Sequence, residues 1–271
     1  TASSTNREVK RNVAIGTDAL IGGTLTGARH LEGNIAIGYQ ALDATAAFEQ
    51  IGTIAIGTKA LGGLTDGQFN VAIGYESQLY QTDGTGNTTL GYQSFRNADN
   101  GESNNVVIGY EAGEFQNHAS SDGNVWIGGE VCVGGTGART NSIAIGYRAW
   151  SNGGTQNNIG GSENIFIGAY SGNGTWATAA SDQNTAVGYN TMAGAMNGAA
   201  YNSAFGFEAL NDLTTGDYNT TLGYKSADAV TTGTHNVAIG ADALGGSTDV
   251  DQAVVVGSQA GTGVMTAAAD G

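Results

Sequence analysis

The chain has 271 residues, 46 of them glycine and none of them proline, and its 9 basic and 24 acidic residues give a formal net charge of −15 at pH 7. Such an acidic surface repels nucleic acids and anionic membranes, so neither nucleic-acid binding nor direct membrane insertion is expected. A single cysteine excludes an internal disulfide, no apolar run is long enough to cross a bilayer, and glycine without a three-residue period excludes collagen.

One short motif, Ala-Ile-Gly and its near relatives, recurs along nearly the whole chain. It occurs fourteen times at intervals of 17 to 22 residues, and its glycines are Gly16, Gly38, Gly57, Gly74, Gly91, Gly109, Gly128, Gly146, Gly168, Gly188, Gly206, Gly223, Gly240 and Gly257. Repetition near a 20-residue period is typical of a solenoid, in which each coil contacts chiefly its neighbours. We therefore predict an all-β chain: a polar lead-in at 1–11 that follows a preceding region, a parallel β-solenoid of about fourteen coils at 12–261, and a tail at 262–271 that leads to a further region.

Within each coil, the three positions before the glycine are predicted to form a short strand. Counting the glycine as position 0, position −1 is always apolar, position −3 is mostly Val or Ile, and position −2 is Ala in eight coils. Apolar triplets without alternation are typical of strands that are buried on both faces. We expect the β-branched residues at −3 and −1 to face the interior of the coil. The small residues at −2 are then expected to face a second packing surface.

Position −4 is predicted to form an amide ladder. It is asparagine in eleven coils, with Thr53, Ser142 and Ala253 as the exceptions. Side chains stacked at the strand spacing of about 4.8 Å can hydrogen-bond from coil to coil and satisfy backbone groups at the corners. The glycine is expected to turn the corner, and the residues at +3 and +4 to pack inward. The predicted ladder residues are Asn12, Asn34, Asn70, Asn87, Asn105, Asn124, Asn164, Asn184, Asn202, Asn219 and Asn236.

Few residues suggest chemistry. His30, His118 and His235 fall at different coil positions without partners at catalytic or metal-binding spacing, and Cys132 is expected to be a small buried hydrophobe. Nucleophile-elbow, zinc-binding and Walker motifs are absent from the sequence. We therefore predict no catalytic residue, no metal, no cofactor and no enzymatic activity. An isolated ion in one acidic turn stays open as an alternative; the acids concerned are Asp66, Asp83, Asp122 and Asp217.

Aromatic residues provide the remaining candidates. Position +1 carries Phe207 and seven tyrosines, and stacked packing is favoured there over binding of the apolar faces of sugars. Trp150 and Trp176 lie near the two longest loops and are the candidates for an exposed receptor contact. The tyrosines at +1 are Tyr39, Tyr75, Tyr92, Tyr110, Tyr147, Tyr189 and Tyr224.

Several repeats resemble those of a known family. Asn-Ser-Ile-Ala-Ile-Gly at 141–146, with Asn-Val-Ala-Ile-Gly at 12–16, 70–74 and 236–240, resembles the head repeat of trimeric autotransporter adhesins of the YadA type. Other coils, such as residues 34–42, are similar to repeats of trimeric phage tail-fibre and related surface proteins. The resemblance covers about residues 12–261. It implies a left-handed parallel β-roll, a side-by-side homotrimer, and an extracellular location on a cell or on a virion tail fibre.

These expectations favour one function over two alternatives. The leading hypothesis is a non-enzymatic structural and adhesive module of a trimeric fibre, a rigid rod that displays loops to a surface receptor such as a glycan or a matrix protein. The alternative is a monomeric solenoid that binds a lattice such as ice or a polysaccharide. A polysaccharide-cleaving solenoid is disfavoured, because such enzymes cluster carboxylates on one face, whereas the acids here scatter over the turns and position +2.

Overall fold

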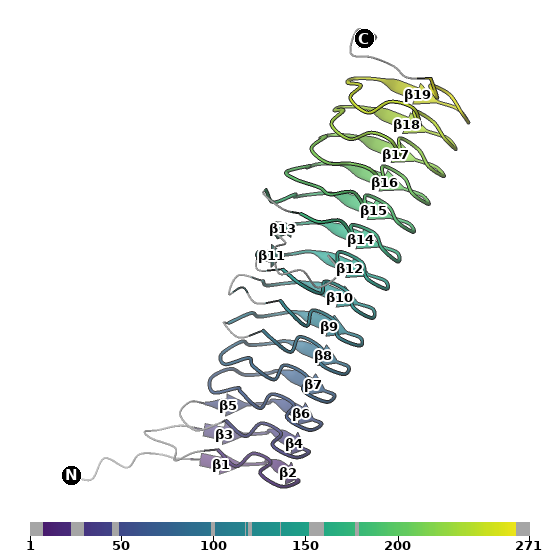
Figure 1. Ribbon diagram of the computed structural model, residues 1–271. Helices are drawn as coiled ribbons and strands as arrows, with labels where there is room; N and C mark the ends of the chain where they lie inside the picture. Colours follow the sequence, from purple (N-terminus) through teal and green to yellow (C-terminus); the bar gives the residue numbers. More distant parts are fainter. Residues whose placement is uncertain are drawn as a thin grey trace, which may run out of the picture. The chain divides into compact units, whose positions relative to one another are not determined.

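The computed structural model describes residues 8–22, 30–44, 49–98, 101–116, 118, 121–135, 137–151, 160–176 and 179–263. Over these ranges the secondary structure consists of short strands and turns, without a helix. The chain divides into two compact units, Thr1–Gly129 and Glu130–Gly271. Each unit is a parallel β-solenoid in which the strands follow one another in chain order (Figure 1).

In the first unit, seven three-residue strands form a long parallel sheet. Each pairs with the corresponding strand of the next coil, with equivalent residues opposite one another. They are β2 (Val13–Ile15), β4 (Ile35–Ile37), β6 (Ile54–Ile56), β7 (Val71–Ile73), β8 (Thr88–Leu90), β9 (Val106–Ile108) and β10 (Val125–Ile127). A smaller parallel sheet contains β1 (Glu8–Lys10), β3 (His30–Glu32) and β5 (Gln50–Ile51). Because β1 pairs with β3, strand pairing begins before residue 12, inside the predicted lead-in.

The second unit repeats this arrangement, again with parallel pairing in register. Its strands are β12 (Ile143–Ile145), β14 (Ile165–Ile167), β15 (Thr185–Val187), β16 (Ser203–Phe205), β17 (Thr220–Leu222), β18 (Val237–Ile239) and β19 (Val254–Val256). A separate pair joins β11 (Arg139–Thr140) to β13 (Gly161–Ser162). The chain makes one turn between successive strands of the long sheets, and the described parts of the two units contain about 12 turns. The predicted all-β parallel solenoid is thus confirmed; most of the predicted tail lies outside the described residues.

Each strand of the long sheets ends at a glycine for two reasons. The backbone φ there lies between 130° and 145°, a region that side chains disfavour. Before the last coil, a Cβ atom would also lie too close to the carbonyl oxygen of the equivalent glycine in the next coil; at Gly74 the distance to the oxygen of Gly91 would be 2.1 Å, and Gly257 is the exception. The prediction that this glycine turns the corner is confirmed.

The prediction for the two strand faces was wrong. In every strand of the long sheets except β2, the middle residue at −2 is buried, whereas the residues at −3 and −1 are half-buried or exposed. The interior of a coil is narrow, and the side chains at +3 and +4 occupy most of it. In the first unit, Ala36 and Ala55 pack there against Leu42 and Leu61. Opposite a leucine at +4 the coil therefore admits only a small residue at −2, and the residues at −3 and −1 point outward.

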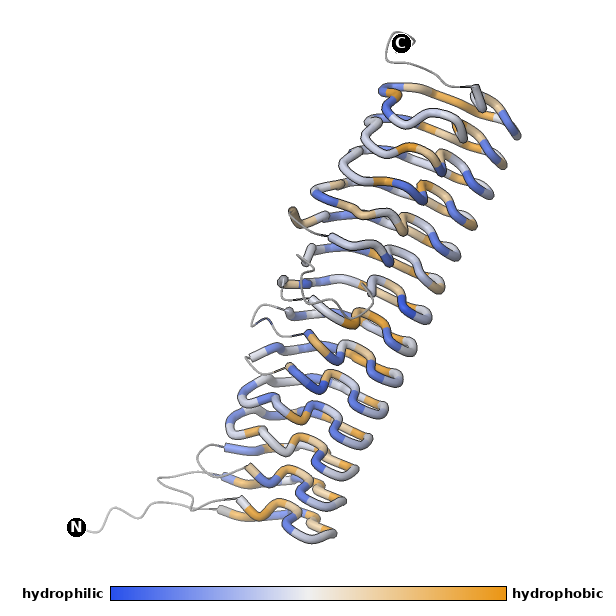
Figure 2. Tube along the Cα trace, in the orientation of Figure 1, coloured by the Kyte–Doolittle hydropathy of each residue, from blue (hydrophilic) through white to orange (hydrophobic). Residues whose placement is uncertain are grey.

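Large residues at −2 are accommodated by glycine at +4. A Cβ on Gly113 would lie 3.0 Å from Trp126, and a Cβ on Gly172 would lie 2.6 Å from Phe166. The coils that precede these glycines carry Phe95 and Trp150 at the same position. A large side chain at −2 is thus compensated by the absence of one at +4, so the interior stays filled while the width of the coil stays constant. Figure 2 shows apolar segments recurring from coil to coil in both units.

Candidate interaction surface

The asparagine column forms the expected ladder inside each unit. Asn219 is representative: its backbone N–H and its Nδ2 both donate to Oδ1 of Asn202, at 2.9 and 3.0 Å. Its Nδ2 also donates to the carbonyl of Gly233 at 2.8 Å, and its Oδ1 accepts from the N–H and Nδ2 of Asn236. In the second unit this pattern links every rung from Asn164 to Asn236. The ladder satisfies buried polar groups, so its role is structural.

The exceptions at position −4 show what the ladder requires. Ser142 keeps the acceptor, because its Oγ accepts the N–H of Asn164 at 3.1 Å. Thr53 accepts no such bond: its N–H donates to Oδ1 of Asn34, while its own Oγ1 is buried without a hydrogen-bond partner. The ladder therefore continues only where the side chain at −4 has an oxygen that reaches the next coil, which asparagine supplies together with a donor.

A second set of polar side chains, at position −6, was not identified from the sequence. In four coils an aspartate there accepts the backbone N–H of the equivalent residue in the preceding coil, at 2.6 to 2.7 Å. These residues are Asp122, Asp182, Asp217 and Asp251. Their shared spacing from the glycine was the available signal. Two of them were candidates for an isolated ion, and over the described residues no group of three or more His, Cys, Asp or Glu side chains could hold a metal.

Trp150 and Trp176 are fully buried, so the prediction of an exposed receptor contact at these residues was wrong. Their ring centroids lie 5.4 Å apart, and both pack against Phe166. The guanidinium of Arg139 lies 4.9 Å from the ring of Trp150 and donates to the carbonyl of Cys132. Trp150 occupies position +4, which faces the interior in every coil where the structure places a bulky residue there. Proximity to a long loop was therefore the wrong criterion.

Cys132 also occupies position +4 and is buried, as predicted. Burial raises the pKa of its thiol to about 12, from an ordinary value of 9.0. In the unfolded chain the thiol ionises near the lower value, so unfolding releases a proton at alkaline pH. The stabilisation that comes from the protonated thiol is complete below about pH 9 and is lost as the pH rises toward 12.

We expect Cys132→Ala to reveal this linkage. The variant is destabilised at pH 8 by the loss of buried volume, but the difference from the wild type shrinks above pH 9, by up to about 1.4 kcal/mol per pH unit. Urea unfolding of both proteins between pH 8 and pH 11 measures it. Other groups that titrate in this range affect both proteins equally. A difference that stays constant with pH would contradict the buried, protonated thiol.

The outward-facing strand residues create an apolar surface on each unit, here called the strand face. It consists of the side chains at −3 and −1, and in single coils these are among the most exposed large hydrophobic residues. Those at least 37% exposed are Val13, Ile15, Leu90, Phe205, Leu222, Ile239, Val254 and Val256. Contiguous apolar surface of this kind marks an interaction site on a water-soluble protein.

The tyrosines at +1 extend the strand face around the corner. Tyr75, Tyr92 and Tyr110 stack with centroids 5.3 Å apart and planes 9° from parallel. A second stack contains Tyr189 and Phe207 at the same spacing. Because neighbouring rings cover each other's faces, these columns do not offer flat aromatic platforms to sugars. The preference for stacked packing is confirmed for these rings.

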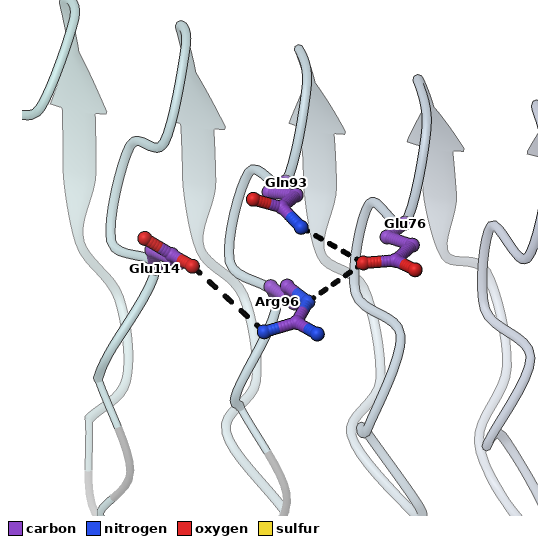
Figure 3. A network of polar contacts seen from close by, with 4 residues as sticks. All are labelled: Glu76, Gln93, Arg96 and Glu114. Carbon is purple, nitrogen blue, oxygen red and sulfur yellow. Dashed lines mark hydrogen bonds and ion pairs between the residues drawn. The ribbon is translucent and has the colours of Figure 1, made fainter.

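Charged residues follow the aromatic corner at positions +2 and +5. Around Arg96, the carboxylate of Glu76 accepts hydrogen bonds from Gln93 and from Arg96, both at 2.8 Å, and Glu114 lies 3.8 Å from Arg96 (Figure 3). Desolvation raises the pKa of Glu76, but the hydrogen bonds from Gln93, Tyr75 and Arg96 outweigh it and leave the pKa below its ordinary value. The strand face is thus bordered on this side by a polar, charge-paired rim.

The fold and this surface define the class of the protein as a parallel β-solenoid with an apolar strand face. Comparison with family models, with curated proteins and with solved structures finds no match to this chain. In the part of the chain that the structure describes, no helix has the length and apolarity needed to cross a membrane.

Proposed function

We propose that this chain is a non-enzymatic structural and adhesive module of a trimeric fibre, located at a cell surface or on a phage tail. Three copies lie side by side as left-handed β-rolls of about fourteen coils, and their strand faces meet at a common axis. The resulting rod is rigid and displays its turns and loops to a surface receptor, a glycan or a matrix protein.

The observation that carries this proposal is the strand face itself. In a lone chain, Leu90 is 45% exposed and Leu222 is 51% exposed, and each stands in a column of Ile, Val, Leu and Phe. Burying such columns against identical columns is favoured by about 25 cal/mol for each Å² of apolar surface removed from water. Side-by-side association about a common axis buries the same surface on every copy, and closed symmetry of this kind is the rule for homo-oligomers.

The lattice-binding alternative receives no comparable support. A surface that matches ice or a polysaccharide lattice needs a regular exposed polar row. The −3 column mixes Thr88 and Thr220 with Val and Ile, and their neighbours Thr89 and Thr221 are buried. The exposed columns are therefore apolar over most coils, which favours protein packing.

The native mass tests the proposal. Light scattering on the full chain is expected to give about 82 kDa, three times the 27.3 kDa of one chain. Leu90→Lys combined with Leu222→Lys places charges in the proposed interface and should shift the mass toward one chain. Thr232→Lys adds a charge at an exposed return turn and should leave three chains together. A wild-type mass of one chain would exclude the trimer.

A further inference from the structure

A row of side chains at position +5 lies beside the turns of the first unit, and Gly62 interrupts it. The next coils carry Leu79, Arg96 and Glu114 at this position, and the last two are joined in the ion pairs of Figure 3. A Cβ on Gly62 would meet Leu79 at 3.2 Å and the carboxylate of Asp43 at 3.4 Å, so Gly62 faces the space between them. A cavity of about 280 Å³ opens at this point.

The cavity presents several kinds of polar group and one apolar wall. Beside Gly62 lie the carboxylate of Asp43, the side chain of Leu79 and the backbone carbonyl of Lys59, and Gln40 and Tyr80 also line the cavity. This mixture of a few convergent polar groups with apolar surface is typical of small-ligand sites. The volume lies just below the range of such sites, which begins at roughly 300 Å³, so the ligand is small.

The carboxyl group of Asp43 is partly desolvated. Desolvation raises the pKa of Asp43, and the attraction of Lys59 is the weakest of the opposing effects. The carboxylate is therefore partly removed from water, and its own backbone hydrogen bond and the weaker attraction of Lys59 compensate this only in part. A ligand that donates hydrogen bonds to this carboxylate would relieve that cost.

The geometry points to a binding site for a single uncharged sugar residue in this cavity. Sugar hydroxyls can donate to Asp43, accept from Lys59 and do both with Gln40, while the C–H face of the ring packs on Leu79 and Tyr80. The net charge of −15 disfavours acidic sugars. As a receptor site, the assignment rests on the proposed function.

The position of the cavity suits a fibre. Its lining residues come from turns, and none belongs to a strand, so the proposed trimer interface leaves it open. Three chains would carry three such sites, and linked sites bind a glycan-covered surface far more tightly than one site binds one sugar.

Saturation-transfer NMR with the full chain tests the site, using the methyl glycosides of glucose, galactose and mannose as separate probes and glycine as a zwitterionic comparison. At least one glycoside should give a saturable signal. Gly62→Leu gives this coil the residue that the next coil carries at Leu79 and should weaken that binding at least tenfold. Asp43→Asn keeps the shape and should also weaken it. Gly245→Leu, at the same repeat position in the second unit, should bind as the wild type does.

Failure to bind any of the three glycosides, saturation by glycine alone, or unchanged binding by Gly62→Leu would overturn the sugar site. The native mass of the same samples keeps this result distinct from the proposed trimer. A native mass of three chains without sugar binding overturns the sugar site and leaves the trimer standing. A native mass of one chain overturns the trimer, whether or not a sugar binds.

Discussion

Replacing Gly240 with alanine is expected to destabilise the second unit by about 4 kcal/mol, far more than the same change at Gly257. Both glycines have a φ of 131°, so the backbone strain of an added side chain is equal. Their surroundings differ. A Cβ on Gly240 would lie 2.6 Å from the carbonyl carbon and oxygen of Gly257, whereas a Cβ on Gly257 would meet nothing closer than Ala260 at 3.7 Å.

Comparing the two variants therefore separates the cost of backbone strain from the cost of steric overlap between coils. Gly257→Ala should cost about 1 to 2 kcal/mol, the usual cost of a strained backbone conformation, and Gly240→Ala should add the cost of forcing two coils apart. Urea unfolding of the full chain measures both, and hydrogen exchange of the amides in β18 and β19 localises the damage. Equal losses in the two variants would show that contact between coils does not explain the glycine column.

The corner glycines and the asparagine ladder were predictable because the repeat displays each as a column. Parallel pairing in register places equivalent residues one strand spacing apart, so the geometry of one coil applies to all. In-register pairing also explains why the aspartates at −6, which were not identified from the sequence, make the same hydrogen bond. Asp182 and Asp217 differ in local sequence, but each accepts the backbone N–H of the equivalent residue in the preceding coil.

The assignment of strand faces could not be made from alternation alone. A period of two establishes that −3 and −1 share a side, but not which side is the interior. The interior is decided by the width that the +3 and +4 side chains leave. Ala36 fits opposite Leu42, and a β-branched residue there would overfill the coil. Trp150 was misplaced because its distance from a loop was considered and its +4 column was not.

Removing one rung of the ladder should have the second large effect. Asn219→Leu keeps the branched shape of the side chain but deletes its bonds to Asn202, Gly233 and Asn236 described above. The carbonyl of Gly233 loses this donor, and Asn236 loses the Oδ1 acceptor for its N–H and Nδ2 inside the coil. Each unsatisfied buried group costs about 1 to 3 kcal/mol, so a loss of about 4 kcal/mol in the free energy of unfolding is expected.

Serine at the same position provides the matched control. At Ser142 the hydroxyl preserves the acceptor for the next rung, bonding the N–H of Asn164 at 3.1 Å, without an Nδ2 donor for the neighbouring carbonyl. Asn219→Ser should therefore cost about half as much as Asn219→Leu, although serine leaves the larger void.

The order of the two variants is informative because volume and hydrogen bonding predict opposite results. If filling the interior dominates, leucine is the milder change, since it replaces the asparagine side chain with apolar atoms of similar size. If the ladder dominates, serine is milder. Urea unfolding of both variants beside the wild type decides between them. A leucine variant as stable as the serine variant would mean that the asparagines are retained for packing, and that the hydrogen bonds along the column contribute little to holding the coils together.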